Sequence, residues 1–87
     1  MDNTILRIAQ IANSYTLMLE RSIIDGHGNA QVIVDACLER MHTEWMEARC
    51  ALVDARYYVV RMIEQAARHG IQPGSDEAIR AIEELGI

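Results

Sequence analysis

Apolar residues recur in steps of four and three along the middle of the chain, in a stretch from Asn29 to His69 that holds no glycine and no proline. This spacing keeps the side chains on one narrow stripe of an α-helix, which we call the seam. The seam consists of Val34, Leu38, Met41, Trp45, Ala48, Leu52, Ala55, Val59, Met62 and Ala66. The pattern predicts one helix over residues 29–69, roughly 60 Å long at about 1.5 Å per residue.

A shorter amphipathic pattern precedes this stretch. Its apolar side chains repeat at three- and four-residue spacing, which predicts a helix over residues 4–24. They are Ile5, Ile8, Ala12, Tyr15 and Leu19. The segment that follows contains Gly26, which can adopt the left-handed conformation that ends a helix, and Asn29, which can cap the next one. Because this connection is short, we expect the two helices to be antiparallel neighbours.

The C-terminal part of the chain predicts a third, short helix. Gly70 ends the long helix, and Ser75 can cap a helix over residues 75–85 with a small apolar face. The expected fold is therefore all-α, with residues 1–87 forming a single helical domain. It consists of an antiparallel helical hairpin with a long second helix and a short C-terminal helix.

The unequal lengths of the helices predict that the protein assembles. A helix over residues 4–24 spans roughly 30 Å and covers only half of the seam, so the part from Leu52 to Ala66 would face water. We therefore expect a homodimer with a four-helix-bundle or coiled-coil-like core built on the seam. In the alternative, the long helix breaks near His42, Thr43 caps a new helix, and the chain is a compact four-helix monomer. The unbroken heptad favours the continuous helix.

Composition excludes several functional classes. The chain has 87 residues and a net charge of −5, and all eight basic residues are arginine, so chemistry that depends on lysine is absent. No apolar run approaches the roughly 20 residues needed to span a bilayer, and the first residues do not resemble a signal peptide. We expect a cytoplasmic protein with no membrane partner. Cys37 and Cys50, thirteen positions apart on one predicted helix, are too distant to pair within it and are expected to be thiols.

A metal site is the main alternative to a purely structural role for the polar residues. Glu39 and His42 are three positions apart, a spacing at which a carboxylate and an imidazole bind metal in ferritin-like proteins. Glu20 on the neighbouring helix is the third candidate ligand. In the heptad, however, Glu39 and His42 flank the seam and do not point into it. We therefore favour a hydrogen-bonded surface pair and expect no metal and no cofactor.

An arginine strip offers a weaker alternative, the binding of nucleic acid. Its members are Arg49, Arg56, Arg61 and Arg68, with Tyr57 and Tyr58 as aromatic neighbours. Acidic residues alternate with these arginines, and a net negative chain lacks the basic surface that nucleic-acid binding requires. The sequence also holds no phosphate-binding loop, catalytic triad pattern or zinc-binding His-Glu-x-x-His motif, so we do not expect an enzyme.

Apolar residues outside the seam are the remaining candidates for binding a partner. Met46, Val53 and Val60 lie outside the seam on the predicted long helix and form a possible outer docking strip. By elimination, the sequence favours a small non-enzymatic protein–protein interaction module. We expect it to bind itself and another protein, as an adaptor, chaperone or inhibitor of a larger partner.

Overall fold

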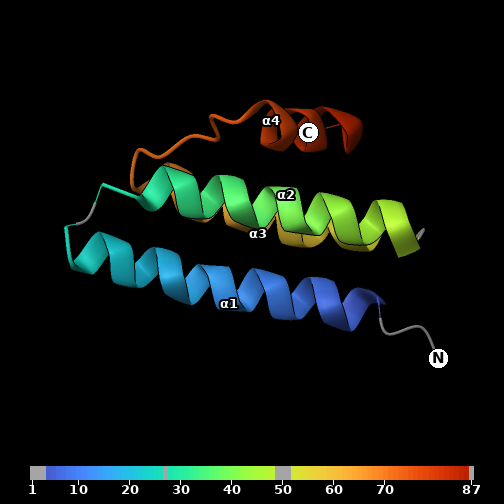
Figure 1. Cartoon of the computed structure of the whole chain (residues 1–87), viewed down its shortest axis with the longest axis horizontal. Helices are drawn as coiled ribbons and strands as arrows, with labels where there is room; N and C mark the ends of the chain where they lie inside the picture. The colour runs from blue at the N-terminus through green and yellow to red at the C-terminus, as the bar shows by residue number, and fades with distance from the viewer. Residues whose placement is uncertain (1–3, 27, 49–51, 87) are drawn as a thin grey trace.

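A computed structural model describes the backbone of residues 4–26, 28–48 and 52–86 and the side chains of residues 6–26, 28–47 and 55–86. Within these ranges the chain is all-helical (Figure 1). The helices are α1 (Thr4–Ile24), α2 (Ala30–Ala48), α3 (Leu52–Arg68) and α4 (Asp76–Glu84). In the part of the chain that is described, no helix combines the length and apolarity needed to cross a membrane.

The continuous helix predicted over residues 29–69 is wrong. α2 and α3 are separate helices that pack against each other, and α2 runs on through His42 and Thr43, so the alternative break at that point is wrong as well. The Thr43 hydroxyl donates to the Glu39 carbonyl 3.1 Å away, a bond inside the helix. The longest dimension of the molecule is 40 Å, too short for a helix of roughly 60 Å. Residues 49–51 lie outside the described residues.

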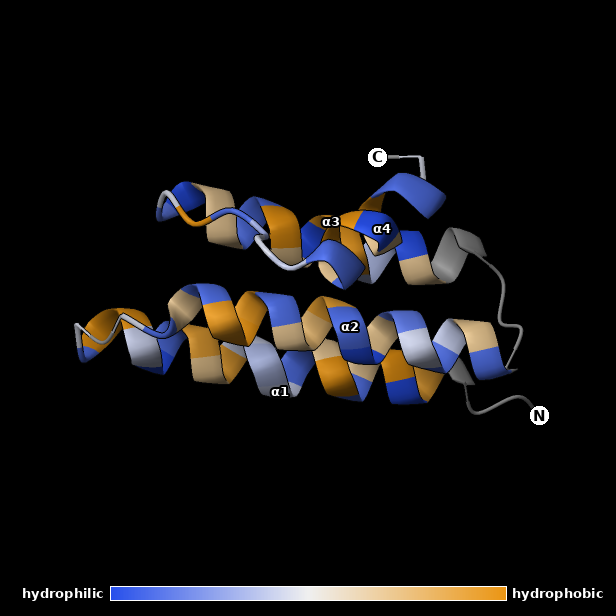
Figure 2. Ribbon diagram, turned by 45° about the horizontal axis from the view of Figure 1, so that its top comes forward, coloured by the Kyte–Doolittle hydropathy of each residue, from blue (hydrophilic) through white to orange (hydrophobic). Residues whose placement is uncertain are grey.

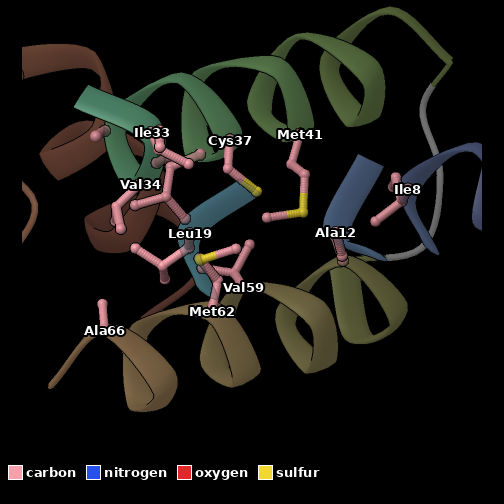
Figure 3. Close-up of a cluster of buried hydrophobic side chains, with 14 of the residues drawn as sticks. Ile8, Ala12, Leu19, Ile33, Val34, Cys37, Met41, Val59, Met62 and Ala66 are labelled. Atoms are coloured by element: carbon pink, nitrogen blue, oxygen red, sulfur yellow. The ribbon is translucent and has the colours of Figure 1, made fainter. Parts of the chain in front are cut away.

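The apolar stripes of α2 and α3 are buried within the same chain. This is the physical reason why two shorter helices form where one long helix was predicted. The eight seam members with described side chains are each at most 2 % exposed within one chain. Counted from residue 50, the seam members of the two halves lie at equal distances along the sequence. Figure 3 shows Val34 and Met41 of α2 in one buried cluster with Val59 and Ala66 of α3. A heptad requires one buried face, and two antiparallel halves satisfy that requirement as well as a continuous helix does.

α2 is the central helix, because α1, α3 and α4 all pack against it (Figure 1). α1 contributes Ile8, Ala12 and Leu19 to the shared core (Figure 3). α4 is held through the fully buried Ala78 and Ala81, whose small side chains allow close approach. The Ser75 hydroxyl accepts a hydrogen bond from the Ala78 amide, 3.1 Å away, and caps α4.

The segment between α3 and α4 is fastened to the first turns of α2. The Gly74 amide donates to the Asp35 carboxylate at 2.8 Å, and the Gln31 amide group donates to the Gln72 carbonyl at 2.9 Å. A Cβ on residue 74 would lie 2.5 Å from Nε2 of Gln31, so glycine permits this close approach. The segment therefore directs α4 back along α2.

Candidate functional site

His42 of α2 binds to α4. Its Nε2 lies 2.7 Å from Oε2 of Glu84, and its Nδ1 lies 3.6 Å from Oε1 of Glu77. The imidazole side chain is 12 % exposed and meets the Trp45 ring edge to face, with 5.1 Å between the centroids. His42 thus links α2 to α4, and each of its ring nitrogens lies near a carboxylate of α4.

The predicted metal ligands are not brought together. Glu20 on α1 accepts a hydrogen bond from Gln65 of α3 at 3.3 Å, and the carboxylates that reach His42 belong to α4 and not to Glu39. Among the described residues, no group of three or more histidine, cysteine, aspartate or glutamate side chains could hold a metal ion. Spacing along one helix could not reveal the α4 carboxylates, because α4 meets His42 only in the folded chain.

The seam residues, predicted as the dimer interface, are core residues of a single chain. Ala48 and Leu52 are the two members whose side chains are not described, and the others are buried. While the chain keeps this fold, a partner cannot contact the eight seam members whose side chains are described. The seam is thus covered within one chain and does not by itself require a dimer, and dimerisation stays a prediction.

The outer docking strip is not formed as one surface of one helix. Met46 is exposed on α2, whereas Val60 is half-buried on α3, and the side chain of Val53 lies outside the described residues. The break between α2 and α3 separates residues that the continuous helix would have aligned.

Two members of the arginine strip, Arg56 and Arg61, make contacts within the chain. Nη1 of Arg56 donates to the Leu85 carbonyl at 2.9 Å and so holds the end of α4. The guanidinium of Arg61 lies 5.6 Å from the centre of the Tyr57 ring. Arg49 lies outside the described residues. Two of the arginines thus have local structural partners.

Cys37 is a core residue of α2. Burial raises the pKa of its thiol to about 12, so the thiol stays protonated at neutral pH and is a poor nucleophile. Cys50, His27 and the first three residues lie outside the described part of the chain. Nothing in the surroundings of Cys37 equips it for redox or nucleophilic chemistry.

An exposed apolar face lies on the side of α1 that points away from the core. Leu6, Leu17 and Ile24 are 57, 67 and 83 % exposed. They are separated by eleven and seven positions, which are about three and two helical turns, so the helical spacing places them in one line along α1. Hydrophobic residues are distributed along the whole ribbon of α1 (Figure 2). We call these three residues the outer face of α1.

The outer face of α1 was not predicted from the sequence, because the opposite side of the helix carries more apolar residues and dominates the pattern. The line is interrupted by Gln10, Asn13 and Glu20, all exposed, and this dilutes the apolar pattern. The available signal was the helical spacing of three aliphatic side chains opposite the core positions. Surfaces of this kind are detected once the buried face of the helix is known.

Comparisons of the chain with protein-family models, with curated proteins and with solved structures find no match.

Proposed function

We propose that the protein is a small non-enzymatic protein–protein interaction module, which serves as an adaptor, chaperone or inhibitor for a larger protein. The observation that supports this most is the outer face of α1, where Leu6, Leu17 and Ile24 expose aliphatic side chains in one line. Aligned exposed aliphatic side chains on a helix are typical of surfaces that receive another protein.

The polar groups give the proposal indirect support. His42, Arg56 and Glu20, which carried the metal and nucleic-acid alternatives, each bind another helix of the same chain. Cys37 is buried with a raised pKa. These polar side chains therefore contribute to contacts between helices or to the core. The aliphatic side chains of the outer face of α1 are instead exposed to solvent.

Geometry suggests how a partner would dock. Leu17 and Ile24 are seven positions apart, the distance between equivalent positions of successive heptads, and Leu6 extends the line to five turns of helix. A helix or a shallow apolar groove on the partner would bury all three side chains together. Gln10 and Glu20 would lie at the rim, where polar contacts fix the register.

The test is site-specific photo-crosslinking in cells that express the protein. A photoreactive residue at position 17 is expected to give covalent adducts with one or a few proteins. The matched control is the same residue at Thr43, an exposed position on α2 away from the outer face of α1. The amount of adduct at position 17 is compared with that at position 43, both in cells and in purified protein at tens of micromolar. No excess at position 17 in either case would contradict the proposal.

A further inference from the structure

The seam can be satisfied by two copies of the chain as well as by one. Its members lie symmetrically about residue 50, so each seam member in α2 has a counterpart in α3 at the same distance from that point. In one chain, α2 and α3 packed antiparallel about residue 50 would set Leu38 level with Met62 and Met41 with Val59, and all four side chains are buried in one core. If α2 and α3 instead formed one helix, two such helices packed antiparallel about residue 50 would set the same residues level with each other.

We propose that the protein forms a domain-swapped dimer in which α3 and α4 of each copy pack against α1 and α2 of the other. The proposal builds on the proposed interaction function and names a second copy of this chain as one partner. Every described contact between the halves is kept, but it is now made between copies. The pairing is isologous and closes as a two-fold dimer, so it does not continue into a fibre.

The connecting sequence favours this exchange. From Asn29 to His69 there is no glycine and no proline, so the sequence between α2 and α3 holds no residue that opposes a continuous helix. The heptad also passes from Ala48 to Leu52 in a step of four, so a continuous helix keeps the seam in register. A chain built only for the compact form would be expected to carry a helix-breaking residue here.

Contacts in the fold define which part of the chain exchanges. The bonds of Gln31 to Gln72 and of His42 to Glu84 join α2 to the segment after α3, so they become contacts between copies in the swapped dimer. The bond from Arg56 to the Leu85 carbonyl stays within one chain, because α3 and α4 move together. This difference makes the exchange directly observable.

The expected affinity follows from the near identity of the two sets of contacts. A short connection gives an effective concentration on the order of millimolar for the contacts within one chain. The two forms therefore balance at roughly that concentration, unless the connection itself favours one of them. A dimer contains two connections, so any substitution that stabilises the continuous helix acts twice.

The test uses short bis-maleimide crosslinking of protein refolded from denaturant at about 20 µM and at about 1 mM, because exchange requires partial unfolding. The variant carries Gln31→Cys and Gln72→Cys on a Cys50→Ala background, and each single-cysteine variant is a control. Cys37 is buried and does not react in the folded protein. Crosslinking within one chain is expected in the monomer fraction, and covalent dimers are expected in the dimer fraction.

A second variant isolates the connection. Insertion of Gly-Ser-Gly-Gly after residue 50 disfavours a continuous helix and lengthens the hairpin connection. We expect it to lower the dimer fraction at 1 mM at least about fivefold while circular dichroism still shows a folded monomer. An unchanged dimer fraction, or a dimer with crosslinks only within each chain, overturns the proposal.

The result is separable from that of the proposed function. If only monomer forms at every concentration while position 17 still gives adducts with another protein, the swapped dimer is wrong and the interaction module stands. If the swapped dimer forms but position 17 gives no adduct, the swapped dimer stands and the proposed binding of another protein through the outer face of α1 is wrong.

Discussion

His42 and Glu84 are 42 positions apart in the sequence, yet Nε2 of the imidazole lies 2.7 Å from the Glu84 carboxylate. Glu77 reaches the other ring nitrogen at 3.6 Å, so one residue of α2 contacts α4 near its first turn and at its last residue. A helix of nine residues is not stable alone in water. The position of α4 therefore depends on this contact together with the burial of Ala78 and Ala81.

Replacement of His42 by alanine is expected to loosen α4. The largely buried imidazole loses its hydrogen bond to Glu84 and its contact with Glu77, which lowers the free energy of unfolding by about 1–2 kcal/mol. Urea denaturation measures this change, and amide hydrogen exchange should increase more in α4 than in α1. Glu83→Gln changes an exposed neighbour and should stay within about 0.5 kcal/mol of the native chain. Equal effects of the two substitutions would argue against the role of His42.

Trp45 is expected to be the most sensitive large residue of the core. It is 2 % exposed, so Trp45→Ala should lower the free energy of unfolding by about 3–5 kcal/mol. Its buried indole Nε1 meets no acceptor among the described residues, so Trp45→Phe removes an unsatisfied donor and should cost clearly less than Trp45→Ala. Urea denaturation of the two variants distinguishes the contributions. A cost below about 1 kcal/mol for Trp45→Ala would place the ring outside the core.

Cys37 should make stability depend on alkaline pH. Burial raises the pKa of the folded-state thiol from 9.0 to about 12, so the unfolded chain loses this proton first as pH rises. The contribution is fully present below pH 9 and is lost between pH 9 and 12, at up to about 1.4 kcal/mol per pH unit. Other groups also titrate in this range, so the measured quantity is the difference in unfolding free energy between the native chain and Cys37→Ala. That difference should fall from pH 8 to pH 10.5, and a constant difference would contradict the assigned burial.

The all-helical fold could be predicted from the sequence. Apolar spacing identifies the buried face of α1, and Ser75 caps α4 where a serine before two acidic residues indicates a helix start. These signals are local, because hydrogen bonds and burial within one helix depend on residues a few positions apart. Local patterns therefore predict helices well.

The arrangement of α2 and α3 could not be predicted from the same pattern. The heptad from Val34 to Ala66 describes which side of the helices is buried, but not whether the covering helix belongs to the same chain. Glycine or proline would have indicated the break, and neither is present. The contact between His42 and Glu84 was hidden for the same reason, since it exists only after α4 has folded back along α2.

Light scattering on the full chain, refolded over a range of concentrations, most directly tests the claim that one set of helix contacts serves both a single chain and a pair. The account predicts a mass of 9.8 kDa after refolding in dilute solution and a rise toward twice that mass as the refolding concentration approaches millimolar. A mass that stays at one chain throughout would contradict the exchange. A dimer that persists in dilute solution would contradict the seam closing within one chain.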